Sequence, residues 1–502
     1  MKYLINELIN QLNVRSNLSE LRKAIKNPQK MEEAQRLLYD EKELLEGFLS
    51  DADPKIRKNA ALLIGDLEWQ DSLDALYQAY QAEDTRFVKS SYLQAMQRLE
   101  VDDLLPDLKQ RIEVLRETRL DDDNRKHVEE EVRELQKLII GCEGIQKHKF
   151  SPLDKKLTVL LVTNKNLREN VAKSINDRLT TAKAKTHPLG VLVETDHFTA
   201  VSKIRTYREL LFPVPGCNML PGVPAKGAEL LWSSGLYQLL CDLHTEGGTF
   251  YYRLEVKDQM DLEKRSEFAR KFTAALDQCS RGKLVNTTSD YEVEIRLMGT
   301  REGNYFPCIR LYTYKDTRFA YRRNAIATSM HPATAALIAE LAKPYLKENA
   351  QIMDPFCGVG TLLIERNHLV AAREMYATDV FGDAITLGRE NAAAAKAHIN
   401  FIHRDFFDFH HEYTFDEVIT DLPMRGKKTR EEMDAFYSSF FEKLPEILSP
   451  EAIIILYTNE AGFVKKQLRL HKEYELLQET NMQKATQTKQ GFDLFIIRAV
   501  KA

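Results

Sequence analysis

The chain has 502 residues, of which 43% are hydrophobic and 29% are charged, and its formal net charge is −4. This length favours roughly three or four domains with ordinary cores. No apolar run reaches the roughly 20 residues that cross a bilayer, and the N-terminus lacks a signal-like apolar core, so we expect a cytoplasmic protein that does not bind membranes. The cysteines form no CxxC pair, which argues against a zinc site, and we expect no metal.

The charge is unevenly distributed along the chain. Residues 1–150 carry roughly −6, residues 151–325 roughly +7 and residues 326–502 roughly −5. A basic middle between acidic ends is a possible nucleic-acid footprint. The excess is modest, so composition alone does not establish RNA binding.

Residues 1–148 are predicted to be helical throughout, with an internal repeat. The segment from Asp53 to Leu67 aligns with Thr85 to Leu99 at an offset of about 32 residues, a period typical of helical repeats. The pattern resembles HEAT repeats and implies a small solenoid, for which a protein partner is a natural expectation. An unrelated helical bundle is the alternative.

The middle of the chain alternates strands and helices in two predicted domains, 149–226 and 227–325. Strands are expected at 157–163, 190–194 and 250–256, and helices near 167–181 and 261–278. The helix at 261–278 is expected to bury a face made by Leu262, Phe268, Phe272 and Leu276. Two or three further strands precede residue 325.

The first of these two domains resembles the ferredoxin-like domain of THUMP-containing RNA-modifying enzymes, with Arg205-Thr206 after a strand and a short helix. The second resembles the THUMP domain itself. It ends in basic residues interleaved with aromatic ones, a composition that suits base stacking and phosphate binding. The basic residues are Arg318, Arg322 and Arg323. The alternative is that about half of the aromatic side chains belong to the core.

Residues 326–502 are predicted to form an α/β domain. A helix opens at 329–336, with Ser329 or Met330 near its cap and His331 in a structural role. Strands and helices then alternate, which gives a parallel sheet. The last two strands are joined without a helix, as expected for an antiparallel final strand. The predicted strands are 351–354, 375–379, 399–403, 417–421, 452–457, 474–482 and 492–500.

The first four predicted strands end in or next to an acidic residue, and ligands bind at this end of an α/β sheet. The turn after Asp354 reads Pro-Phe-Cys-Gly-Val-Gly-Thr and resembles motif I of S-adenosylmethionine (SAM)-dependent methyltransferases. The resemblance implies SAM as cofactor. It places four residues along the methionine part of SAM, and those residues are Asp354, Phe356, Gly358 and Gly360.

The same resemblance assigns roles to the residues that follow. Thr361 would cap the helix, Asp379 would bind the ribose hydroxyls, and Asp405 would accept the adenine amino group with Phe406 beside the ring. Cys357 is expected to be a packing residue rather than a nucleophile.

The fourth predicted strand leads into Asp421-Leu422-Pro423-Met424, which occupies the motif IV position of amino-methyltransferases. The Asp421 carboxylate and the Leu422 carbonyl can accept the two N–H groups of an exocyclic amine, and Pro423 stiffens the turn. Met424 stands where the family usually has an aromatic residue that stacks on a flipped base. Because of this departure, the segment does not predict which base is methylated.

These observations predict a multidomain protein with an all-α HEAT-like N-terminus, an α+β ferredoxin-like and THUMP middle, and a Rossmann-like class I methyltransferase C-terminus. The predicted function is methylation of an exocyclic base amine, at guanine N2 if the family resemblance holds, in structured RNA such as tRNA or rRNA. The alternatives are a DNA or protein amino-methyltransferase and a non-catalytic SAM- or RNA-binding scaffold.

Overall fold

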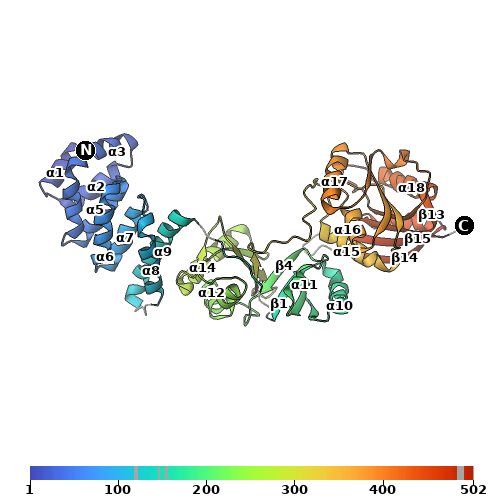
Figure 1. Ribbon diagram of the computed structural model, residues 1–502, viewed down its shortest axis with the longest axis horizontal. Helices are drawn as coiled ribbons and strands as arrows, with labels where there is room; N and C mark the ends of the chain where they lie inside the picture. Colours follow the sequence, from blue (N-terminus) through green and yellow to red (C-terminus); the bar gives the residue numbers. More distant parts are fainter. Residues whose placement is uncertain (118–121, 145–146, 153–155, 483–490, 501–502) are drawn as a thin grey trace. The chain divides into compact units, whose positions relative to one another are not determined.

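The computed structural model describes residues 1–117, 122–144, 147–152, 156–482 and 491–500 (Figure 1). The chain divides into two compact units. The first contains residues 1–151, 214–307 and 311–313, and the second contains residues 152–213, 308–310 and 314–502.

Nine helices, counted within the described residues, make up the N-terminal part of the first unit. Helices α2, α5, α7 and α9 pack in succession, α2 on α5, α5 on α7 and α7 on α9. The approach of α5 to α7 is close, since a Cβ on Gly65 would lie 2.5 Å from the Cα of Ala95. The helices are α1 (Lys2–Ile9), α2 (Val14–Ala24), α3 (Pro28–Leu38), α4 (Lys42–Gly47), α5 (Pro54–Asp66), α6 (Leu73–Ala82), α7 (Arg86–Met96), α8 (Leu105–Glu117) and α9 (Asp122–Glu143), with short 3₁₀ turns at 39–41, 48–50, 70–72 and 102–104.

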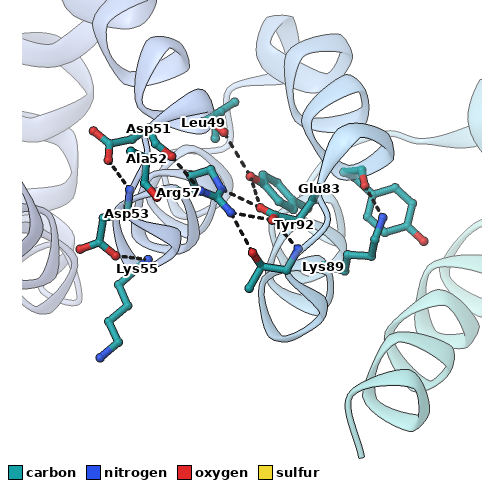
Figure 2. Close-up of polar contacts among 11 residues, drawn as sticks. Leu49, Asp51, Ala52, Asp53, Lys55, Arg57, Glu83, Lys89 and Tyr92 are labelled. Carbon is teal, nitrogen blue, oxygen red and sulfur yellow. Dashed lines mark hydrogen bonds and ion pairs between the residues drawn. The ribbon is translucent and has the colours of Figure 1, made fainter. Parts of the chain in front are cut away.

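A partly buried ion pair connects α5 to Glu83, just before the second of the two segments that align in the sequence repeat (Figure 2). Arg57 donates from Nε and Nη2 to the two carboxylate oxygens of Glu83, at 2.8 and 2.6 Å. Its Nη1 donates to the carbonyl of Asp51 at 2.8 Å, and the backbone N–H of Thr85 donates to Glu83. The guanidinium therefore links the turn before α5 to the turn before α7.

The remainder of the first unit combines helices with a parallel strand pairing. Strand β5 lies between β6 and β7 and runs parallel to both. In α14 the side chains of Phe268, Phe272 and Leu276 are buried as expected, but Leu262 is 72% exposed because it lies in the first turn of the helix. The elements are α12 (Pro224–Ser233), α13 (Leu236–Asp242), β5 (Phe250–Lys257), α14 (Leu262–Ser280), β6 (Leu284–Asn286) and β7 (Val293–Gly299).

The second unit opens with a four-stranded arrangement of order β2-β3-β1-β4, antiparallel throughout. Strand β4 also pairs with residues 308–309 of β8 (Tyr305–Leu311). Strands β2 and β4 were not predicted. In β2, the exposed side chains of Lys183 and Lys185 interrupt the apolar run by which a strand would have been recognised. The elements are β1 (Leu157–Val162), a 3₁₀ turn at 165–167, α10 (Arg168–Arg178), β2 (Ala182–His187), β3 (Gly190–Thr195), α11 (Phe198–Ser202) and β4 (Glu209–Pro213).

A seven-stranded sheet of order β11-β10-β9-β12-β13-β15-β14 forms the C-terminal part of the second unit. The first five strands in this order are parallel, and β15 runs antiparallel to both β13 and β14. The prediction of a parallel sheet with an antiparallel final strand is therefore confirmed. Residues 483–490 of the expected join lie outside the described residues. The strands are β9 (Ala350–Asp354), β10 (Ala372–Asp379), β11 (Asn400–His403), β12 (Phe415–Asp421), β13 (Leu448–Thr458), β14 (Tyr474–Met482) and β15 (Phe492–Ala499).

Helices cover both faces of this sheet. Alternate residues of β12 point to opposite faces, so Val418 joins the apolar core under α18, while Glu417 meets Arg366 of α16. Helix α15 begins after His331, whose Nδ1 accepts the Ala333 N–H at 3.1 Å, so His331 is the cap in place of Ser329 or Met330. The helices are α15 (Pro332–Ala342), α16 (Thr361–Leu369), α17 (Gly382–Ala395), α18 (Arg430–Ile447) and α19 (Ala461–Leu470), with 3₁₀ turns at 343–345 and 406–408.

Candidate active site

The Gly-rich turn that follows β9 is built on a buried carboxylate. The Asp354 side chain accepts hydrogen bonds from the Thr420 hydroxyl at 2.7 Å and from the Phe356 N–H at 3.2 Å. Burial raises its pKa to about 7, and the nearby Asp379 carboxylate adds to the shift. Through these two hydrogen bonds, Asp354 fixes the start of the turn and connects the end of β9 to the end of β12.

The same turn is anchored to β10 on its other side. The Cys357 N–H donates to the Thr378 carbonyl at 3.0 Å. The Cys357 thiol is buried, and burial raises its pKa, which fits packing rather than nucleophilic chemistry.

Both glycines of the turn adopt left-handed backbone conformations, for different reasons. Gly358 has φ +51° and its N–H donates to Asp379 at 2.9 Å, while a Cβ there would meet nothing within 4 Å. Gly360 has φ +75°, and a Cβ there would lie 2.7 Å from the Phe401 ring. The backbone is therefore open to a ligand at Gly358, whereas Gly360 makes room for a core aromatic residue.

Helix α16 begins at Thr361, directly after this turn. Gly360 occupies the cap position, so the expectation that the Thr361 side chain caps the helix is wrong. The Thr361 hydroxyl is buried and has no hydrogen-bond partner among the described residues. A buried polar atom without a partner is costly, and one at the start of a helix beside an open glycine can bond to a ligand.

Asp379 ends β10 beside the turn and is half-buried. Its two oxygens accept the N–H groups of Gly358 at 2.9 Å and of Phe381 at 2.9 Å. Phe381 itself is 67% exposed. A carboxylate held by two backbone N–H groups retains lone pairs for ligand hydroxyls, and the exposed ring of Phe381 follows two residues later in the sequence.

The segment after β11 differs from the expectation in one respect. Asp405 is exposed and accepts the Phe407 N–H at 3.0 Å, which starts a 3₁₀ turn. The Phe406 ring is only 1% exposed and packs against Phe356 and Phe440, with ring centroids 5.8 and 5.7 Å away. The expected contact of Phe406 with an adenine ring is therefore not available in this structure, because the ring belongs to the core.

The segment from Asp421 to Met424 lies at the end of β12. Asp421 is half-buried, and the Leu422 N–H donates to the carbonyl of Tyr457 on β13 at 2.9 Å. Pro423 is half-buried and Met424 is 50% exposed. The hydrogen bond from Thr420 to Asp354 connects this segment to the Gly-rich turn.

One aromatic residue beside Asp421 was not predicted. Tyr457 is the register partner of Asp421 in the parallel pairing of β12 and β13. Its ring stacks on Phe492 at 4.7 Å with an interplanar angle of 8°. Burial, followed by the Asp421 charge, raises the pKa of Tyr457. Its position at the end of the fifth strand was the only signal in the sequence that could have identified it.

Arg318, which was expected at the RNA surface, is structural instead, and so is Arg205. Arg205 donates from Nε and Nη2 to the buried Glu365 of α16 at 2.8 and 2.7 Å, and Tyr321 donates to the same carboxylate at 2.6 Å. Arg318 is buried and donates to the carbonyls of Ile204 and Tyr207. Neither guanidinium is presented for phosphate binding. Arg323 is exposed.

The described residues contain no group of three or more His, Cys, Asp or Glu side chains that could hold a metal ion. None of the helices in the described part of the chain is long and apolar enough to span a membrane.

Residues 320–490 match the UPF0020 family model, described as an RMKL-like methyltransferase domain. Within residues 320–490 the chain is therefore a SAM-dependent methyltransferase domain. Its cofactor is SAM. The backbone at Gly358 is open, the Thr361 hydroxyl has no hydrogen-bond partner among the described residues, and the Asp379 carboxylate accepts the Gly358 N–H beside them.

Two solved structures are similar to the chain in fold. TrmN from Thermus thermophilus has 18% sequence identity and a TM-score of 0.51, and the match covers 68% of this chain and all of that one. SMU.472, crystallised in complex with SAH, has 13% identity and a TM-score of 0.52, covering 69% of this chain and 99% of that one. No curated protein matches the chain significantly.

Proposed function

We propose that the protein methylates an exocyclic amine of a base in structured RNA, namely N2 of guanine in tRNA or rRNA. The observation that carries this proposal is the position of Asp421 and Leu422 at the end of β12, joined to the Gly-rich turn by the Thr420–Asp354 hydrogen bond.

The proposed chemistry follows from the electronic structure of the substrate. The lone pair of an exocyclic amine is delocalised into the base, so the nitrogen is a weak nucleophile. The Asp421 carboxylate and the Leu422 carbonyl accept its two N–H groups, which concentrates the lone pair on nitrogen, and the carboxylate then takes the proton that is released. SAM supplies an electrophilic methyl group when bound.

The surrounding residues restrict the geometry of this reaction. The Leu422 N–H bond to the Tyr457 carbonyl fixes the peptide that presents the Leu422 carbonyl, and Pro423 restricts the turn that follows. Met424, which follows Pro423, is exposed. Its side chain can lie against the face of a base, with less directional preference than an aromatic ring.

We further propose that the middle of the chain binds the RNA. The βαββαβ order of residues 157–213 and its antiparallel sheet fit a ferredoxin-like domain, and residues 227–325 fit a THUMP domain. Exposed Lys183 and Lys185 on β2 add positive charge at the edge of that sheet, where phosphates can be neutralised. The stacked helices of residues 1–148 fit a HEAT-like domain that binds a protein partner.

The test is incubation of the protein with radiolabelled SAM and total RNA that lacks its own modifications, with DNA and protein extracts alongside. Label in RNA, recovered as N2-methylguanosine and abolished by Asp421→Ala while SAM affinity persists, is the expected result. Label in DNA or protein would redirect the proposal to those substrates. SAM binding without label in any extract would favour a non-catalytic scaffold.

A further inference from the structure

A buried amide oxygen lies beside the proposed catalytic segment. Asn459 directly follows β13, and the parallel register pairs Tyr457, two residues earlier, with Asp421. The carboxyl ends of neighbouring parallel strands meet at one edge of the sheet. Asn459 therefore lies at the same edge as Asp421, on the side away from the Gly-rich turn, because β12 separates β13 from β9.

The Asn459 side-chain oxygen has no hydrogen-bond donor in the part of the chain that the structure describes. This oxygen, Oδ1, is buried. An amide oxygen that is buried without a donor destabilises the folded state. Such a group in a folded protein calls for an explanation, and a substrate that donates a hydrogen bond would provide one.

The backbone around Asn459 is well fixed. The Thr458 hydroxyl is hydrogen-bonded to Tyr437 at 2.7 Å and accepts the Glu460 N–H at 3.0 Å. The ring of Tyr457, two residues before Asn459, stacks on Phe492 of β15. The fold thus fixes the backbone on either side of Asn459, and its side-chain oxygen lacks a partner among the described residues.

The chemistry of the purine bases indicates which group would donate a hydrogen bond to the Asn459 oxygen. Guanine carries the N1–H donor next to its N2 amine, whereas the ring nitrogen next to the N6 amine of adenine is an acceptor. A site that holds the N2 amine at Asp421 and Leu422 therefore brings N1–H to an adjacent position. An acceptor there favours guanine over adenine.

We propose that Asn459 is a specificity-determining residue that accepts the N1–H of the target guanine through Oδ1. This inference rests on the proposed function, since it takes Asp421 and Leu422 to hold the amine. It adds a residue from the fifth strand to the substrate pocket.

Two substitutions separate an acceptor role from other roles. Asn459→Leu removes the acceptor at similar size, and Asn459→Asp retains an acceptor but removes the donor. The measurement is the initial rate of label transfer from radiolabelled SAM into guanosine of total unmodified RNA. We expect Asn459→Leu to lower the rate about 10- to 100-fold. We expect Asn459→Asp to stay at least about tenfold faster than Asn459→Leu, because a retained acceptor preserves that hydrogen bond.

Gln467 offers a matched control. It is a fully buried amide whose Oε1 also lacks a partner among the described residues, and its Nε2 donates to Ser438 at 3.0 Å. It lies about two turns along α19, away from the strand ends. Gln467→Leu should leave the rate per folded molecule unchanged, and all variants should bind SAM with the affinity of the native protein.

The outcomes distinguish this inference from the proposed function. An unchanged rate for Asn459→Leu, or equal rates for Asn459→Asp and Asn459→Leu, would overturn the inference while guanine methylation stands. Loss of SAM affinity in Asn459→Leu would also overturn it, because the residue would then act on the cofactor. Label in adenosine, or no label in RNA from the native protein, would remove the proposed function and this inference together.

Discussion

The ion pair between Arg366 on α16 and Glu417 on β12 provides a quantitative test of what holds the methyltransferase sheet to its helices. Both side chains are fully buried. Arg366 Nε donates to Glu417 at 2.8 Å, and Nη2 donates both to Glu417 at 2.5 Å and to the Lys347 carbonyl at 2.8 Å. Nη1 donates to the Val370 carbonyl, and the Lys347 N–H donates to Glu417 at 3.0 Å.

The perturbation is Glu417→Gln, which keeps the shape of the side chain and removes its charge. The Arg366 guanidinium then remains buried without a counter-charge, and breaking a buried pair in this way costs about 3–5 kcal/mol. At 1.4 kcal/mol per factor of ten, amide exchange that depends on unfolding should become about 10²- to 10⁴-fold faster.

Hydrogen-exchange mass spectrometry of peptides from β12 and α16 measures this change directly on the full chain. The double variant Glu417→Leu with Arg366→Met should recover much of the loss, because it leaves no buried charge. The exposed pair Lys465–Glu479 is the control, and Glu479→Gln should change exchange little. A Glu417→Gln variant with native exchange rates, or a double variant as unstable as the single one, would refute the reasoning.

Gly360→Ala forces φ +75° on an alanine and places its Cβ against Phe401, so we expect a loss of about 1–3 kcal/mol in a denaturant titration; an unchanged midpoint would contradict the clash. Asp354 has a folded-state pKa of about 7 against an ordinary value of 3.8. Its protonated form is favoured by folding, so its stabilising contribution is present below about pH 4 and is lost as the pH rises through about 7. Asp354→Asn should remove this component of the pH dependence of the denaturation midpoint, and identical pH profiles would argue against the shift. Glu365→Gln weakens the pairing with Arg205, and it should increase proteolysis of residues 198–213 with no change in the exposed Glu479→Gln control.

The order of the elements in the C-terminal half can be predicted from the sequence because it is encoded locally. Apolar runs of strand length alternate with segments whose apolar residues recur at helical spacing, and each apolar run ends at a polar residue. The local pattern alone therefore predicts Asp354, Asp379 and Asp421 at the ends of strands. All three lie at the carboxyl edge of one sheet in the folded chain, as the parallel alternation requires.

Burial and pairing between distant segments could only be decided by the tertiary structure. Arg205 and Glu365 are 160 positions apart, and a basic residue after a strand has the same local pattern whether it binds phosphate or a buried carboxylate. Phe406 follows a strand-end acid, but packing against helix α18 turns its ring into the core. Asn459 carries no motif, and its side-chain oxygen lacks a partner among the described residues because the folded chain buries it. Local sequence determines where backbone elements begin and end, whereas desolvation depends on every segment that packs around an atom.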